Sequence, residues 1–119
     1  MEESPRRIGI NRIVFERTST IPNISSDVIC HSVKEANEFL TKVRDSLLGH
    51  GMDCMIVDFT IFFENKEEHF FSLGFNANKE KIDLSRRIIK DLRDARNDRR
   101  ASDELKVSIN NFLAKYSFK

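Results

Sequence analysis

The most regular pattern in the chain lies in its middle, where apolar and polar residues alternate. The apolar positions are Met55, Val57, Phe59, Ile61 and Phe63. Alternation with a period of two predicts a strand that buries one face. A second run repeats the pattern with Phe71, Leu73 and Phe75, and the intervening "ENKEE" predicts a hairpin connection. Ile56 and Phe62 interrupt the polar face of the first strand, so we expect that face to be partly covered.

Two further strand signals precede this hairpin. Residues 8–17 predict a first strand with Ile13 and Phe15 on one face and a bend near Gly9. Residues 18–26 have the composition of a loop, in which Pro22 interrupts any strand pairing. The segment "DVICHS" that follows predicts a short edge strand.

A first helix is predicted between these strands and the hairpin. Ser32 is its expected N-cap, and Glu35 completes a capping box by reaching back to the Ser32 backbone N–H. Gly49 is expected to end the helix in the left-handed conformation. The apolar stripe of this helix repeats at intervals of three and four and consists of Val33, Ala36, Leu40, Val43 and Leu47.

Two more helices are predicted after the hairpin. The first begins in "NANKEKIDL", where two asparagines are suited to capping, and has an apolar line of Leu84, Ile88, Leu92 and Ala95. Apolar residues are almost absent from 96 to 104, and Ser102 can cap a final helix. The stripe of that helix consists of Leu105, Ile109, Phe112, Leu113 and Tyr116.

These elements predict a single domain over residues 1–119, with residues 1–7 as a flexible tail. The expected fold class is α+β, a two-layer arrangement of an antiparallel sheet with three to four strands. Two to three helices pack on one face of the sheet, in the order β(β)αββαα. The Phe-rich face of the hairpin is expected to form the interface with the first two helices.

The C-terminal part of the chain differs in charge from the rest. The net charge is +1, yet residues 1–80 hold 9 Lys/Arg against 13 Asp/Glu, and residues 81–119 hold 11 against 6. Such asymmetry can orient a charged partner. No apolar run is long enough for a membrane span, and the N-terminal residues lack the apolar core of a signal peptide. With two cysteines that form no disulfide framework, we expect a cytoplasmic protein without a membrane partner.

The basic residues concentrate in a predicted helix over residues 86–100. Its candidate partner- or nucleic-acid-binding residues are Arg86, Lys90, Arg93, Arg96, Arg99 and Arg100. Acidic residues also lie on this helix, and spacings such as Lys90–Asp94 allow i,i+4 ion pairs on a solvated face. The two interpretations, a binding surface and an ordinary solvated face, both stay open.

Known nucleic-acid and catalytic signatures do not fit. "EHFFSLGF" lacks the basic-Gly-aromatic pattern of an RNA-recognition motif, and "NANKEKIDL" lacks the lysine cluster of a double-stranded-RNA-binding domain. No glycine-rich phosphate loop occurs. The residues that could ligate zinc have no standard spacing, and they are Cys30, His31, His50, Cys54 and His69. We therefore expect no enzyme, no cofactor, no metal and no small-molecule substrate.

The segment from "HSVKEANEFL" through "VDFTIFFENKEEHFFSLGFN" to "LSRRIIKDL" resembles the large polyvalent protein-associated domains of phage and mobile elements. The resemblance covers roughly residues 31–92, and Phe59, Ile61 and Phe63 match the family's first strand. Asn65-Lys66 stands where the family has an Asp-Gly turn. The resemblance implies a mobile-element accessory protein, such as an anti-CRISPR inhibitor of a host defence complex, and no catalytic residue.

The sequence thus favours a small non-enzymatic protein-interaction module that acts by blocking a partner's surface. Its expected contacts are the basic residues of 86–100 or the acidic hairpin tip. The alternative is a nucleic-acid-binding protein that uses the same basic helix.

Overall fold

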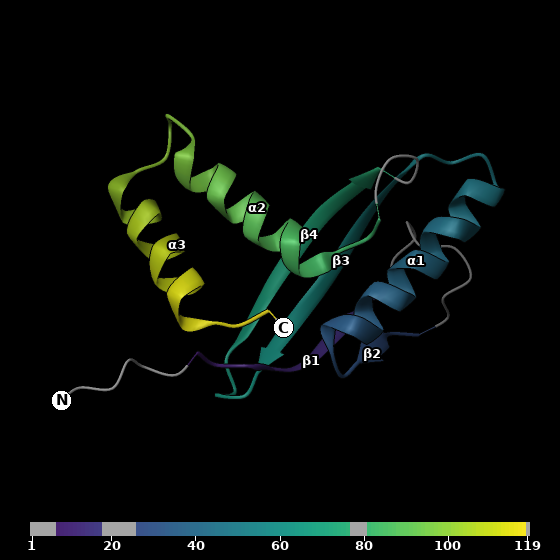
Figure 1. Cartoon of the computed structure of the whole chain (residues 1–119), viewed down its shortest axis with the longest axis horizontal. Helices are drawn as coiled ribbons and strands as arrows, with labels where there is room; N and C mark the ends of the chain where they lie inside the picture. The colour runs from purple at the N-terminus through teal and green to yellow at the C-terminus, as the bar shows by residue number, and fades with distance from the viewer. Residues whose placement is uncertain (1–6, 18–25, 77–80, 119) are drawn as a thin grey trace.

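The computed structural model describes residues 7–17, 26–76 and 81–118. Its elements are β1 (Ile10–Phe15), β2 (Val28–Cys30), α1 (Val33–Gly49), β3 (Cys54–Phe63), β4 (Glu68–Asn76), α2 (Leu84–Asn97) and α3 (Asp103–Lys115). The strands form one antiparallel sheet in the order β2-β1-β3-β4. Figure 1 shows α1 at the β1–β2 end of the sheet and α2 and α3 on the side of β4. The predicted α+β fold is confirmed, and the optional second strand is present as an edge strand.

The core lies between the helices and one face of the sheet. All five alternating residues of β3, from Met55 to Phe63, are buried, as are Leu73 and Phe75 of β4. The predicted stripe of α1 is buried against them, and the ring centroids of Phe15 and Phe39 are 4.9 Å apart. The helices α2 and α3 complete this layer. Burial of these apolar side chains supplies the main driving force for folding.

The first helix begins as predicted but differs in detail at both ends. The Ser32 hydroxyl accepts a hydrogen bond of 3.1 Å from the Glu35 backbone N–H, which confirms the N-cap. The Glu35 carboxylate accepts from the N–H of His31 at 2.7 Å, one residue before the donor expected for a capping box. Gly49 is the last helical residue, and the left-handed conformation falls on Gly51, with φ of 76°. The backbone N–H groups of residues 50, 51 and 52 donate hydrogen bonds to the carbonyls of Leu47 and Leu48 at the end of α1.

The hairpin between β3 and β4 closes without a glycine. The Lys66 N–H donates to the Phe63 carbonyl at 3.0 Å, and the Phe63 N–H donates to the Glu67 carbonyl at 2.9 Å. Lys66 takes the left-handed conformation, with φ of 70°. This is the geometry of a tight turn followed by one left-handed residue. The Asn65 side chain accepts from the Glu67 N–H at 3.1 Å and holds the turn.

The second helix starts after the two asparagines that were predicted to cap it. Asn76 is the last residue of β4, and Asn78 lies outside the described residues. Asp83 is the N-cap instead, and its carboxylate accepts from the Arg86 N–H at 3.2 Å. The Asn37 side chain of α1 accepts from the Leu84 N–H at 2.8 Å. A residue on one helix therefore satisfies a free N–H group at the start of another.

The prediction of one helix through residue 100 is wrong. The helix α2 ends at Asn97 because Asp98 adopts an extended conformation, with ψ of 135°. The Asp98 carboxylate accepts from the Arg100 N–H at 2.8 Å, which stabilises a turn. Ser102 then caps α3 as predicted, with a hydrogen bond of 3.1 Å from the Leu105 N–H.

The segment after α3 pairs with the segment before β1. Ile8 and Tyr116 form a parallel bridge, in which the Ile8 N–H donates to Lys115 at 2.7 Å and the Ser117 N–H donates to Ile8 at 2.8 Å. Continuous sheet pairing begins at Ile10, two residues after the predicted start. The predicted tail, except Arg7, and the predicted loop 18–26, except Ser26, lie outside the described residues.

The contact between α1 and α2 gives a stability prediction. Replacing Asn37 with Ala leaves the half-buried Leu84 N–H without its acceptor, so we expect the free energy of unfolding to fall by about 1–2 kcal/mol. Urea unfolding followed by circular dichroism measures this. The matched control is Asn111→Ala, at an exposed position of α3. Equal unfolding midpoints for the Asn37 variant and the wild type would show that this hydrogen bond does not contribute.

Candidate interaction surfaces

The sheet face opposite the helices carries a continuous row of side chains. Ile29 pairs with Val14, Val14 with Thr60, and Thr60 with Phe70, so the row crosses all four strands. Ile29 is 55% exposed and Phe70 is 59% exposed. Ile56, which is 56% exposed, belongs to the same face of β3. We call these five residues the sheet-face row.

Local structure explains why these apolar side chains are exposed. The cross-strand neighbour of Ile56 is Gly74, which has no side chain to cover it. A Cβ added to Gly74 would meet no atom within 4 Å. Ile29 and Phe70 lie on the two edge strands, so each has a neighbouring strand on one side only. The expectation that this face is partly covered is therefore wrong for Ile56.

The charged residues around the sheet-face row are mostly acidic. Asp58, Glu68 and Glu16 lie on this side of the sheet, and Asp58 accepts a hydrogen bond of 2.6 Å from the Ser72 hydroxyl. The one cation on the described strands of this face is Arg12, whose guanidinium lies 4.0 Å from the centre of the Phe62 ring. Such a cation–π contact also flattens Arg12 against the sheet. The charge around the sheet-face row is therefore mainly negative.

The six predicted basic residues do not all lie on one helix. Lys90 pairs with Asp94 at 3.0 Å, as the i,i+4 spacing indicated, and Arg100 pairs with Asp98 at 3.1 Å. Arg86 and Arg99 are exposed and make no ion pair with any described residue. Arg99 and Arg100 follow the end of α2 and so lie outside the helix. The hydrogen bonds with Arg100 lower the pKa of the Asp98 carboxyl, which keeps this pair charged.

Arg93 and Arg96 lie instead at a groove between α2 and α3. The groove has a volume of about 350 Å³. The Arg96 Nη1 donates to the side-chain oxygen of Asn110 at 2.9 Å, which connects the two helices. The full lining is Arg7, Ile89, Arg93, Arg96, Asn110, Leu113, Ala114, Tyr116, Ser117 and Phe118.

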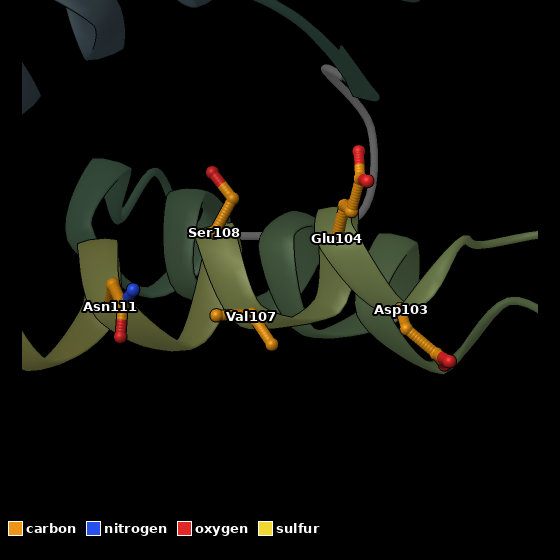
Figure 2. Close-up of a pocket in the computed structure, with 5 residues that line it drawn as sticks. All are labelled: Asp103, Glu104, Val107, Ser108 and Asn111. Atoms are coloured by element: carbon orange, nitrogen blue, oxygen red, sulfur yellow. The ribbon is translucent and has the colours of Figure 1, made fainter.

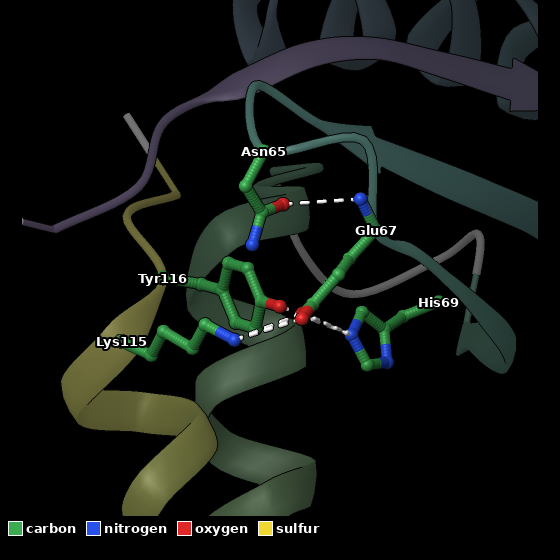
Figure 3. Close-up of polar contacts among 5 residues, drawn as sticks. All are labelled: Asn65, Glu67, His69, Lys115 and Tyr116. Carbon is green, nitrogen blue, oxygen red and sulfur yellow. Dashed lines mark hydrogen bonds and ion pairs between the residues drawn. The ribbon is translucent and has the colours of Figure 1, made fainter.

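A polar cluster joins the hairpin tip to the end of α3. Figure 3 shows Lys115, His69 and Tyr116 gathered around the Glu67 carboxylate. The Lys115 ammonium donates to Glu67 at 2.9 Å, and His69 Nε2 lies 3.7 Å from the same carboxylate and 3.4 Å from the Tyr116 hydroxyl. The hydrogen bond from Lys115 is the main cause that holds the pKa of Glu67 below its ordinary value. These contacts connect the tip of the hairpin to the end of α3, so the cluster stabilises the attachment of that helix.

A larger depression, of about 540 Å³, lies along α3. It is lined by residues of this one helix, from Asp103 to Asn111. Figure 2 shows that the Glu104 and Ser108 side chains point to one side of the helix while Val107 points to another. Because the side chains diverge, they do not converge on a common ligand atom, and the depression has no catalytic arrangement.

The thiols and histidines do not assemble a reactive or metal centre in the part of the chain that the structure describes. No group of three or more His, Cys, Asp or Glu side chains there could hold a metal ion. Burial and the Glu35 carboxylate raise the pKa of the Cys30 thiol, and the Asp53 side chain raises the pKa of Cys54. Both thiols are therefore poor nucleophiles at neutral pH.

Comparison with known proteins gives no relative: no family model, no curated protein and no solved structure matches the chain. Over the described ranges, none of the helices combines the length and the apolar character that crossing a bilayer requires. The interpretation of function consequently rests on the surfaces of the molecule.

Sequence reasoning located the basic residues but missed the sheet-face row as a site. The signal was present, since Ile56 and Phe70 fall on the face opposite the buried phenylalanines. What the sequence did not give was the strand order. The row becomes continuous only because β1 lies between β2 and β3.

The Glu67 cluster predicts a pH dependence of stability. A carboxyl whose pKa is lowered in the folded protein contributes stability at neutral pH, and this contribution is lost as the pH falls through the folded-state pKa. We expect Glu67→Gln to unfold at a lower urea concentration than the wild type at neutral pH, and this difference should shrink in acid as the Glu67 carboxyl becomes protonated.

The matched control is Glu68→Gln, because the adjacent Glu68 makes no side-chain hydrogen bond or ion pair with a described residue. It should leave the unfolding midpoint unchanged at neutral pH and in acid. A Glu67 variant with the same loss of stability at neutral pH and in acid would contradict the role of the ionised carboxylate.

Proposed function

We propose that this protein is a non-enzymatic interaction module that binds the surface of a partner protein through its sheet-face row. The observation that carries the proposal is the contiguity of Ile29, Val14, Thr60 and Phe70 across four strands, with the outer two more than half exposed. The exposed apolar members are Ile29, Ile56 and Phe70, and Thr60 is the polar member of the row. Scattered exposed apolar residues are ordinary, whereas several of them gathered on one face and rimmed by polar residues are typical of interaction sites.

The chemistry of this face supports a proposal for the kind of partner. An aromatic ring and two isoleucines can anchor in an apolar patch and dominate the binding free energy. The acidic rim of Asp58, Glu68 and Glu16 is complementary to basic residues around such a patch. We therefore propose a partner protein whose apolar contact patch is surrounded by Lys or Arg, with the charges accelerating association.

Binding of this kind acts by occupying a surface, so it requires no reactive group in this chain. The resemblance to the mobile-element domains adds one class of partner, a host defence complex whose working surface would be blocked. That class stays a prediction, because it comes from the sequence pattern alone.

A second candidate is nucleic-acid binding through Arg86, Arg93 and Arg99, none of which is neutralised by an ion pair with a described residue. The ion pairs of Lys90 and Arg100 weigh against it, because they remove two of the six predicted cations from such a surface. Binding to phosphates would weaken steeply between about 50 and 200 mM salt. Binding through the apolar side chains of the sheet-face row would not weaken steeply over this range of salt.

The proposal predicts that a double variant with Phe70→Ser and Ile29→Ser loses its partner. Both side chains are mostly exposed, so the fold should persist while the apolar anchors are removed. We expect the affinity to fall by about 2 kcal/mol or more, which is roughly thirtyfold. Proteins captured from the organism that encodes the chain would be purified, and their direct binding would be measured by calorimetry.

The matched control is Val107→Ser, on the exposed side of α3 at 57% exposure. It should bind a true partner as the wild type does. Equal binding by the control and the double variant would contradict the sheet face as the site. Binding that instead falls steeply with salt and is lost in Arg86→Glu would favour the nucleic-acid alternative.

A further inference from the structure

The groove between α2 and α3 combines three guanidinium groups with no carboxylate. Arg7, Arg93 and Arg96 line it, and none of the residues that line it is acidic. Asn110 and Ser117 add polar groups that can hydrogen-bond. The remaining lining is largely apolar, with Ile89 and Leu113 from the two helices and Phe118 from the segment that follows. A concave site of this composition attracts an anion that carries an apolar or planar body.

The nearby acidic residues do not neutralise this groove. Every carboxylate of α2 and its two caps is engaged by another group. Asp83 caps the helix, Asp91 pairs with Arg87 at 3.0 Å, Asp94 pairs with Lys90, and Asp98 pairs with Arg100. The side chains of Arg7 and Arg93 form no ion pair or hydrogen bond with a described residue. Among the described residues, no carboxylate therefore compensates the positive charge of Arg7 and Arg93.

The groove is also held in shape by the fold. Arg93 and Arg96 are three residues apart on α2, which puts their side chains on neighbouring positions of one helix face. Asn110 fixes one nitrogen of Arg96 at 2.9 Å, and the guanidinium keeps other N–H donors available. The bridge between Ile8 and Tyr116 holds the N-terminal and C-terminal segments together, so that Arg7 and Ser117 line the same groove. Segments from both ends of the described chain thus complete one site.

We propose that this groove binds a small phosphate ester, with its phosphoryl oxygens held by Arg93, Arg96 and Arg7. Arginine guanidinium groups form paired hydrogen bonds to phosphate oxygens, and two neighbouring arginines can contact one phosphoryl group. The apolar body of the ligand, such as a nucleoside, lies against Ile89, Leu113 and Phe118. This site is distinct from the sheet-face row and does not depend on it.

The observations favour a small ligand over a nucleic-acid strand. The volume of about 350 Å³ lies at the lower end of the range for small-molecule sites. A strand would need cations spaced along a continuous path, whereas Lys90 and Arg100 are paired with acids outside the groove. The three arginines Arg7, Arg93 and Arg96 instead line one groove.

Calorimetric titration of the full chain with pyrophosphate, adenosine diphosphate and a short single-stranded oligonucleotide tests this assignment. At about 50 mM salt, we expect adenosine diphosphate to bind more tightly than pyrophosphate, because the apolar lining adds contacts. Arg93→Gln and Arg96→Gln should each weaken the binding of both ligands by roughly tenfold or more. The matched controls are Arg86→Gln and Arg99→Gln, at exposed arginines that do not line the groove, and they should change the affinity less than about twofold.

Three results would overturn the proposal. One is the absence of binding by pyrophosphate and adenosine diphosphate to the wild type. Another is an equal loss of affinity in the control and groove variants, which would show an unlocalised effect of positive charge. The third is tighter binding of the oligonucleotide than of either small ligand, with Arg86 and Arg99 contributing. Urea unfolding of each variant establishes that it is folded, and failure of this test leaves the sheet-face proposal unaffected.

Discussion

The architecture depends on the packing of aromatic rings around Phe63, at the end of β3. Its ring centroid lies 3.8 Å from that of Tyr116, and the rings of Phe112, Phe118 and His69 are all within 6.2 Å. These contacts bring together residues that are about fifty positions apart in the chain. They fix the end of α3 against the hairpin, and the pair of Glu67 with Lys115 reinforces this attachment from outside. The groove between α2 and α3 follows from this attachment, because Tyr116 and Phe118 both line the groove and pack on Phe63.

The local elements were predictable because short-range chemistry determines them. The alternation of β3, the stripe of α1 and the serine caps at Ser32 and Ser102 are each confirmed. The errors occur where a side chain from elsewhere, or a competing local hydrogen bond, decides the outcome. Asp98 ends α2 by turning its carboxylate to the Arg100 N–H, and Asn37 reaches from α1 to the start of α2. Asp98 and Arg100 lie in the segment whose end they determine, so the end of α2 has a local signal in the sequence. The contact from Asn37 has no such signal, because Asn37 belongs to another helix.

The candidate sites were less predictable than the fold because they are assembled across elements. Arg93 and Arg96 were predicted as binding residues of one basic helix, and the structure places them at a groove that also includes Arg7 and Phe118. The sheet-face row likewise requires the strand order, which a sequence pattern does not contain. The two surfaces lie on different parts of the molecule, an acidic-rimmed apolar sheet and a basic groove between helices. This separation matches the opposite net charges of the two parts of the chain.

The central claim is that one sheet face is buried under the helices while the other is open to solvent. Methyl NMR spectra of isoleucine-labelled protein with a soluble paramagnetic agent test it most directly. The account predicts strong relaxation of the Ile29 and Ile56 methyl groups, which are more than half exposed, and protection of Ile13 and Ile61, which are fully buried. Equal protection of all four residues would show that the sheet face is already covered in the free protein and would contradict the account.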